Sequence, residues 1–322
     1  MIHVGDALEV LRNMPGESVH CCVTSPPYYG LRDYGVDGQL GLEPVHDCLG
    51  WATGQNCGEC FTCNMRAVFA EVRRVLRTDG TFWLNMGDSY AGGGGHYPNA
   101  PSNVDSKSGR YGRALKKGGL PCVGGLKAKD LAMIPARLAL ALQQDGWWLR
   151  SDVIWAKPNP MPESCKDRPA RAHEHIFLLT RSRRYFYDHD AVKVPVAECT
   201  LNDRVDNGKN RVDRGFPGTP SAGGGRLGSS DFRSLRTVWT IPTHPFPDAH
   251  FATFPPELAA TCVKAGCPAD GVVLDPFTGA GTTGLVATQL GRRFVGIELN
   301  PKYAAMADER IRIKAGLLLE TA

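Results

Sequence analysis

Short apolar runs alternate with longer amphipathic stretches along most of this chain, a pattern that predicts strands and helices in alternation. Strands are predicted where the apolar runs are short, at residues 2–4, 19–24, 81–86, 147–155, 176–180, 272–274 and 294–297. Helices are predicted where apolar residues recur on one face. They lie after Asp6, over 66–77, over 135–144, over 255–264, from the glycine-rich turn at 279–284 to residue 290, and from residue 301 onward. Gly80 is the expected stop of the helix over 66–77. The pattern indicates an α/β protein.

The last third of the chain carries the clearest signal. The strand at 272–274 leads into a glycine-rich turn and a helix, and the next strand ends at Glu298. Asn300 is placed to cap a final helix that begins at Pro301. This is a βαβ unit with a glycine-rich first turn and an acid after its second strand, and open α/β sheets bind ligands at such turns.

Two stretches, 91–129 and 188–237, lack a clear period and are expected to be a glycine-rich basic loop and an insertion. Ten glycines lie between Ala91 and Gly125. The whole chain has 37 Lys and Arg residues against 33 Asp and Glu residues, which is a weak excess of positive charge. The distribution of this charge along the chain is therefore more informative than its sum. Such loops either contact a polyanion or are ordinary solvated loops. In the first stretch, between Ser102 and Lys127, six basic residues stand against one acid, Asp105: Lys107, Arg110, Arg113, Lys116, Lys117 and Lys127.

The chain is expected to be cytoplasmic. It has no apolar run near the roughly 18 residues that a membrane span needs, and its first six residues lack the basic and apolar regions of a secretory signal. Most of its eleven cysteines are therefore expected to be free thiols.

One cysteine cluster stands apart, in an expected insertion at residues 46–65. Its four thiols could bind one tetrahedral zinc ion with a structural role, since four thiolates leave no open position. Iron–sulfur ligation and a metal-free cluster both remain open as alternatives. The four candidate ligands are Cys48, Cys57, Cys60 and Cys63.

The glycine-rich turn suits a ligand that carries a ribose. Gly279, Gly281 and Gly284 have the spacing of dinucleotide-binding folds, and the Glu298 carboxylate can chelate ribose hydroxyls. NAD, FAD and S-adenosyl-L-methionine all satisfy this pattern. A zwitterion fits it better, because Asp275 could take an ammonium group, while a helix N-terminus with two threonines, Thr282 and Thr283, could take a carboxylate.

A second motif, Ser25-Pro26-Pro27-Tyr28, ends the strand at 19–24. Its two prolines make a rigid loop that cannot continue a central strand. Such a loop can hold carbonyls and the Ser25 hydroxyl against the exocyclic amine of a base, and Tyr28 offers a ring for stacking a flipped base. The motif favours methyl transfer from S-adenosyl-L-methionine over the redox chemistry of NAD.

Together the segments Thr24–Gly35 and Asp275–Thr283 resemble the site-specific DNA amino-methyltransferases, with similar segments at 85–90, 154–163, 168–187 and 250–255. The catalytic motif precedes the cofactor motif here, the circularly permuted order that resembles the β class. The resemblance implies a Rossmann-like S-adenosylmethionine-dependent methyltransferase fold, a mostly parallel twisted sheet with helices on both faces, in one domain over 1–322. It also implies that the insertion at 188–237 recognises the target.

The resemblance also assigns site residues. The catalytic set is the Ser25–Tyr28 motif. The cofactor set contains the residues already named at the glycine-rich turn and five more. Its members are Asp6, Phe254, Asp275, Pro276, Phe277, Gly279, Gly281, Thr282, Thr283, Glu298 and Asn300. The DNA-binding set consists of five residues of the basic loop and two residues beyond it, namely Lys107, Arg110, Arg113, Lys116, Lys117, Lys157 and Asn159. Double-stranded DNA is the expected partner, and a homodimer and a cognate restriction endonuclease are expected possibilities in a bacterial, archaeal or phage setting.

Ser-Pro-Pro-Tyr is typical of enzymes for N4 of cytosine, and Asp-Pro-Pro-Tyr of enzymes for N6 of adenine. Ser25 therefore favours cytosine, with adenine as the alternative. C5 chemistry would need a cysteine nucleophile after a proline, and Pro121-Cys122 lacks the rest of that motif. A zinc-containing nucleic-acid-binding module is a rival hypothesis, and amino-methylation of RNA or protein is a closer one.

Overall fold

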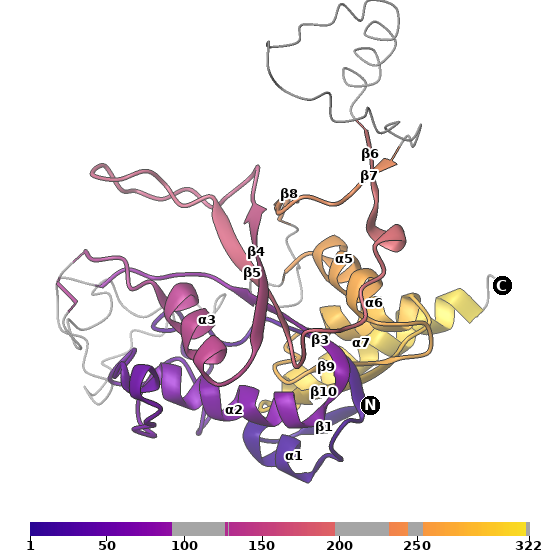
Figure 1. The fold of residues 1–322 in the computed structure, drawn as a ribbon, viewed down its shortest axis with the longest axis horizontal. Coiled ribbons are helices and arrows are strands. Elements are labelled where there is room, and N and C mark those ends of the chain that lie inside the picture. The colour runs from indigo at the N-terminus through magenta and orange to yellow at the C-terminus, as the bar shows by residue number, and fades with distance from the viewer. Residues whose placement is uncertain (92–125, 128, 197–231, 244–253, 320–322) are drawn as a thin grey trace, which may run out of the picture. The chain divides into compact units, whose positions relative to one another are not determined.

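The computed structural model describes residues 1–91, 126–127, 129–196, 232–243 and 254–319. The chain divides into two compact units, one of residues 1–188 with 237–322 and one of residues 189–236. The larger unit contains an eight-stranded sheet in the order β1-β10-β9-β2-β3-β5-β4-β8 (Figure 1). Its strands are β1 (Ile2–Val4), β2 (Val19–Thr24), β3 (Leu76–Met86), β4 (Trp148–Ala156), β5 (His173–Thr180), β8 (Val238–Thr240), β9 (Val272–Asp275) and β10 (Arg293–Glu298).

The sheet is mostly parallel, as the sequence predicted. Only β5 runs against its neighbours β3 and β4 among these eight strands. β8 was not predicted, and it pairs in parallel with the end of β4 through Ile154–Ala156. The buried Trp239 of β8 lies 6.1 Å from Trp83, centroid to centroid, so aromatic packing adds to the backbone pairing that holds this strand of only three residues.

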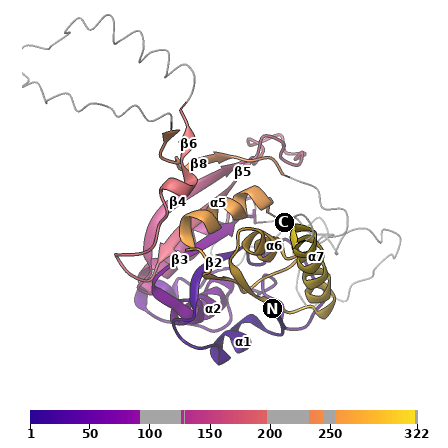
Figure 2. The same ribbon diagram turned by 90° about the vertical axis from the view of Figure 1, so that its right-hand side faces the viewer.

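Helices cover both faces of the sheet (Figure 2). One face carries α1 (Ala7–Asn13), α2 (Phe61–Val75) and α3 (Ile134–Gln144), and the other carries α5 (Pro256–Gly266), α6 (Thr282–Gln289) and α7 (Pro301–Leu319). The two-sided burial explains why β2 is largely apolar and buried along nearly its whole length. Cys22 belongs to the core beneath α2, whereas the Cys21 thiol lies beside Gly266 of α5.

The boundary between α2 and β3 differs from the prediction. The helix ends at Val75 rather than residue 77, and β3 begins directly at Leu76. Gly80 does not stop the helix. It lies inside β3, where the register against β2 shifts, and a Cβ there would lie 2.7 Å from the Leu76 side chain and 2.9 Å from the His20 carbonyl oxygen. The glycine therefore permits a bulge in a crowded strand.

The smaller unit, residues 189–236, contains the short helix η2 (Asp190–Val192) and the antiparallel pair β6 (Val194–Pro195) and β7 (Phe232–Arg233). The prediction that 188–237 recognises the target falls largely on residues 197–231, which lie outside the described residues. The same is true of the loop residues Lys107, Arg110, Arg113, Lys116 and Lys117. Within the described chain, no helix has the length and apolar character needed to cross a membrane.

Candidate active site at the carboxyl ends of the central strands

The two motifs that lie 251 residues apart in the chain meet at the centre of the sheet. β2 and β9 are neighbours, and at their carboxyl ends the Thr24 hydroxyl donates a 2.6 Å hydrogen bond to Oδ1 of Asp275. The strand that follows β9 in the chain, β10, lies on one side of this pair, and the strand that follows β2, β3, lies on the other side. This is the topological switch point, where open α/β sheets bind their ligands.

The glycine-rich turn after β9 is tied to the end of β10 by Glu298. Its Oε2 accepts from the Gly279 amide at 2.8 Å, and its Oε1 accepts from the Asn300 amide at 2.9 Å. Each carboxylate oxygen keeps a lone pair for a further donor. Gly281 has φ of +76°, and a Cβ there would lie 2.9 Å from the Cβ of Ala307. Only glycine therefore fits this close approach of the turn to α7.

Two tyrosines that sequence reasoning missed lie near Glu298. Burial raises the pKa of Tyr34 and of Tyr303, and the charge of Glu298 raises both further. Burial also raises the pKa of Glu298 itself. A half-buried carboxylate with lone pairs left over suits a ligand that carries ribose hydroxyls. Tyr34 lies within the segment Thr24–Gly35 but had no assigned role, and Tyr303 carried no signal in the sequence.

Asp275 is the most deeply buried acid of the site, with 2% of its surface exposed. Burial raises its pKa to about 6, against the opposing hydrogen bonds from Thr24 and the Phe277 amide. A carboxylate that is costly to keep ionised gains from a cationic ligand. The contact of Asp275 with an ammonium group stays a prediction.

Other predicted cofactor residues serve the fold in this structure. The Thr283 hydroxyl donates to the Val23 carbonyl at 3.2 Å, and the Thr282 hydroxyl accepts from Arg310 at 3.2 Å. Asp6 caps α1 by accepting from the Glu9 amide at 3.0 Å. Phe277 packs edge-on against Phe69. Phe254 is buried, and Asn300 accepts from the Lys302 amide at the start of α7 as expected of a cap. Their contacts with a cofactor remain predictions.

The Ser25–Tyr28 loop is held by a hydrogen-bond network between β2, β3 and β5. The Tyr28 hydroxyl lies 2.6 Å from Oε2 of Glu174 and 3.3 Å from the Ser25 hydroxyl. Nδ2 of Asn85 donates to the Tyr28 hydroxyl at 2.9 Å and to Glu174 at 3.0 Å. Burial and then the charge of Glu174 raise the pKa of Tyr28 well above its usual value. The hydroxyl therefore stays protonated and donates to the carboxylate.

The Tyr28 ring needs Gly87, the residue after β3. A Cβ at Gly87 would lie 2.6 Å from Cε2 of the Tyr28 ring, well inside van der Waals contact. A side chain at this position would displace the ring from the place where Glu174 and Asn85 reach its hydroxyl. Gly87 therefore belongs to the site, although its glycine character alone gave no functional signal in the sequence.

Glu174 is in turn balanced by Lys157, which was predicted to bind DNA. The Lys157 ammonium forms an ion pair with Oε1 of Glu174 and lies 4.3 Å from the centroid of the Trp155 ring. The Lys157 and Glu174 side chains are only 18% and 13% exposed. Asn159 uses its amide group to hold Thr243, donating to its carbonyl at 3.1 Å and accepting from its amide at 2.9 Å. DNA contacts by Lys157 and Asn159 remain predictions.

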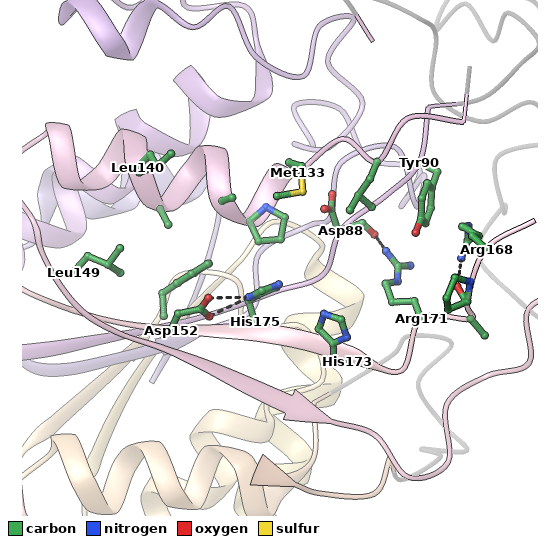
Figure 3. Close-up of a pocket in the computed structure, with 17 residues that line it drawn as sticks. Asp88, Tyr90, Met133, Leu140, Leu149, Asp152, Arg168, Arg171, His173 and His175 are labelled. Atoms are coloured by element: carbon green, nitrogen blue, oxygen red, sulfur yellow. Dashed lines mark hydrogen bonds and ion pairs between the residues drawn. The ribbon is translucent and has the colours of Figure 1, made fainter. Parts of the chain in front are cut away.

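A cavity of about 550 Å³ lies on the other face of β5 (Figure 3). His173 and His175 line it, on either side of Glu174 in the strand, because successive strand residues point to opposite faces. His175 pairs with Asp152 at 3.0 Å. The Arg168 guanidinium lies 3.8 Å from the Tyr90 ring centroid at the polar end. None of the Ser25–Tyr28 residues lines this cavity, which is separate from the site at the switch point.

The whole chain is similar to known methyltransferases. A family model described as DNA methylase, of the N6 and N4 type, matches residues 19–309. The Type II methyltransferase M.XycI of Xanthomonas campestris pv. cyanopsidis is 46% identical over 308 residues, which cover 96% of this chain and 86% of that protein. The Type II methyltransferase M.SmaI of Serratia marcescens is 44% identical over 311 residues, covering 96% and 90%.

Solved structures share the fold. The PvuII DNA methyltransferase, cytosine-N4-specific, aligns with a TM-score of 0.59 at 18% identity and covers 99% of this chain and 92% of its own. A putative DNA modification methylase from Thermus thermophilus, solved with S-adenosyl-L-methionine, aligns with a TM-score of 0.56 at 24% identity, covering 98% and 93%.

The strand order and the two motifs at the switch point define an α/β methyltransferase with the Rossmann-like fold, so the predicted fold is confirmed. More narrowly, the chain belongs to the family of N6 and N4 DNA methylases. Its catalytic motif precedes its cofactor motif, as in the β class, and the resemblance predicted from the sequence is thereby confirmed.

Proposed function

We propose that this DNA amino-methyltransferase transfers a methyl group from S-adenosyl-L-methionine to N4 of cytosine in double-stranded DNA. The observation that carries the proposal is the meeting of the two motifs at the carboxyl ends of β2 and β9, where Thr24, just before the Ser25–Tyr28 loop, bonds to Asp275 beside the turn that Glu298 holds. Ser25 at the head of the motif favours cytosine. The similarity of the fold to that of PvuII methyltransferase, described as cytosine-N4-specific, agrees with this choice. N6 of adenine is the alternative.

The residues present fit the cofactor. Glu298 has lone pairs left for ribose hydroxyls, and Asp275 offers a buried carboxylate for the ammonium group of the methionine part. The glycines at 279 and 281 leave the turn free of side chains. S-adenosyl-L-methionine supplies, when bound, a methyl group activated by a positively charged sulfur.

The loop residues orient the acceptor amine. The lone pair of an exocyclic amine is conjugated with the ring, and hydrogen bonds from its N–H groups to the Ser25 hydroxyl and the loop carbonyls move it toward a more nucleophilic geometry. Tyr28 supplies a stacking face for the flipped base. Catalysis then rests on orientation and hydrogen bonding in one in-line displacement, without a covalent enzyme–base intermediate.

The proposal extends to the partners and the location of the protein. The basic loop at 91–129 would neutralise DNA phosphates, and the insertion at 188–237 would read the target sequence. The relatives named above are type II methyltransferases, which agrees with a partner restriction endonuclease. A homodimer and a location in the cytoplasm, where DNA is accessible, belong to the same proposal.

The test is methylation of plasmid DNA followed by nucleoside analysis. We expect N4-methylcytosine from the wild-type protein, and none from Ser25→Ala at equal cofactor affinity. N6-methyladenine would assign the adenine alternative in place of cytosine. If methyl transfer to RNA or to protein occurs and plasmid DNA stays unmodified, the DNA assignment is wrong.

A further inference from the structure

Four cysteine side chains converge at the start of α2, outside the active site. Their sulfur atoms all lie within 4.8 Å of one another, and the Sγ atoms of Cys48 and Cys63 are 3.5 Å apart. Cys60 and Cys63 are buried, while Cys48 and Cys57 are exposed. All nine cysteines that the structure describes are free thiols, but only these four form such a group among the described residues.

The spacing fits a single tetrahedral ion. Zinc–sulfur bonds of about 2.3 Å place the ligand sulfurs of a tetrahedron about 3.8 Å apart. A cluster of several iron atoms needs thiolates on opposite sides of its core, and therefore farther apart. We propose that Cys48, Cys57, Cys60 and Cys63 bind one zinc ion, and that this ion fixes the chain between the catalytic loop and α2.

The backbone around the cysteines already supports thiolate ligands. Amide groups point at three of the four sulfur atoms, at distances that suit N–H···S hydrogen bonds. Such donors stabilise the negative charge of a metal-bound thiolate and orient the ligand. The bonds run from the Gly50 amide to Cys48 at 3.3 Å, from the Cys60 amide to Cys57 at 3.3 Å, and from the Cys63 amide to Cys60 at 3.4 Å.

A buried arginine supports the same segment. The Arg66 side chain, 9% exposed, donates to the Gln55 carbonyl at 2.8 Å and to Oδ2 of Asp145 at 2.7 Å. Arg66 lies three residues after Cys63 in α2, and both side chains are buried. Four thiolates around a divalent cation carry a net charge of about −2, so a cation held beside them lowers the cost of burying that charge.

The ion would act on the active site through packing alone. The amides of Phe61 and Thr62 at the start of α2 donate to the carbonyls of Val45 and His46 at 3.0 and 3.1 Å. Phe61 and His46 pack against Tyr29, with ring centroids 5.5 and 6.1 Å away. Tyr29 follows directly on the catalytic motif. Because four protein ligands leave no open position, the role is structural.

The experiment measures metal on the full chain, purified under reducing conditions without chelators. Elemental analysis of the wild type should find about one equivalent of zinc per chain. Cys57→Ser removes an exposed ligand with little loss of core packing and should abolish stoichiometric zinc. Cys165→Ser is the matched control, because Cys165 is a half-buried thiol outside the cluster, and it should keep the zinc content of the wild type.

Two further readouts need no substitution. Replacement of zinc by Co²⁺ should produce the intense visible absorption of a tetrahedral thiolate site, and strong chelators should lower the melting temperature of the wild type while exposing four additional titratable thiols. Iron in place of zinc, a disulfide between Cys48 and Cys63, or a metal-free protein with all thiols titratable would each overturn the proposal. The metal readouts do not involve methyl transfer, so they fail or succeed separately from the proposed function.

Discussion

The hydroxyl of Tyr28 offers the sharpest test of the active-site geometry. From sequence alone the ring accounts for this residue, and Tyr28→Phe is expected to keep most activity because phenylalanine stacks equally well. The structure changes that expectation. The hydroxyl donates to Glu174 at 2.6 Å and accepts from Asn85 at 2.9 Å, so Tyr28→Phe should loosen the catalytic loop.

The magnitude follows from what remains after the substitution. A hydrogen bond to a charged group contributes about 1.5–3 kcal/mol. Glu174 keeps its contacts with Asn85 and Lys157 in the variant, so the carboxylate is not left unpaired. The lower end of the range is therefore expected, which corresponds to a loss of roughly tenfold in methyl transfer, since about 1.36 kcal/mol is a factor of ten.

The assay compares Tyr28→Phe, Glu174→Gln and the double variant by kcat and KM for plasmid DNA, together with calorimetric affinity for S-adenosyl-L-methionine. Because the two groups share one bond, their effects should not add; contacting residues couple by about 0.5–3 kcal/mol. Cofactor affinity should stay unchanged, since the proposed cofactor contacts lie in the turn after β9 and at Glu298. Tyr185→Phe, which removes an exposed tyrosine hydroxyl bonded to Arg150, serves as control and should keep wild-type kinetics.

Two results would refute this reasoning. Wild-type kcat in Tyr28→Phe would show that the hydroxyl network does not hold the loop in its active geometry. Strictly additive losses in the double variant would show that Glu174 acts independently of Tyr28, and the positioning role of Glu174 would have to be abandoned.

Three further predictions concern the cofactor, pH and DNA. Glu298→Ala should weaken S-adenosyl-L-methionine binding by about 1.5–3 kcal/mol for each ribose hydrogen bond removed, whereas the exposed Glu257→Ala should not; calorimetry that finds equal affinities would exclude Glu298 as the ribose ligand. Asp275 has a folded-state pKa of about 6 against 3.8 ordinarily, so the ligand-free folded state binds more protons than the unfolded state in that window. The free energy of unfolding of the ligand-free protein should therefore lose about 2 kcal/mol of the contribution of Asp275 as pH rises from 4 to 6, and urea unfolding of Asp275→Asn should lack this decrease. Replacing Lys107, Arg110, Arg113, Lys116 and Lys117 together by alanine should flatten the salt dependence of DNA binding by about 0.9 for each phosphate that is no longer neutralised, and an unchanged slope would show that these residues do not touch the backbone.

The βαβ unit near the C-terminus could be predicted closely because its determinants are local. Apolar runs bounded by glycine, a Pro at the start of a helix and Asn300 as cap all act within a few residues. The strand at 272–274 and the last strand were expected within a residue of β9 and β10. The predicted end of α2 was wrong because its determinant is not local. Gly80 is a helix stop by local rules, but the pairing of β3 with β2 uses it in a bulge.

The motif residues Ser25–Tyr28 and Asp275–Glu298 were identified from the sequence, because rigid prolines and closely spaced glycines are typical of ligand-binding loops. The residues that hold these motifs were assigned no role, although Asn85 and Gly87 lie in the similar segment at 85–90 and Glu174 in the one at 168–187. Asn85, Gly87 and Glu174 come from β3, its following turn and β5, and an Asn, a Gly or a Glu alone carries no signal. Only strand order brings them beside Tyr28.

The sequence by itself was therefore enough to identify the family, the two motifs and the four clustered cysteines, since each depends on the types of residues that lie close together in the chain. Tertiary structure alone decided that Lys157 faces Glu174, that Tyr34 and Tyr303 lie near Glu298, and that Gly87 leaves space for the Tyr28 ring. The physical reason is that charge pairing and steric fit between distant segments depend on which strands are neighbours. Strand order is set by the packing of both sheet faces as a whole, which no short stretch of sequence encodes.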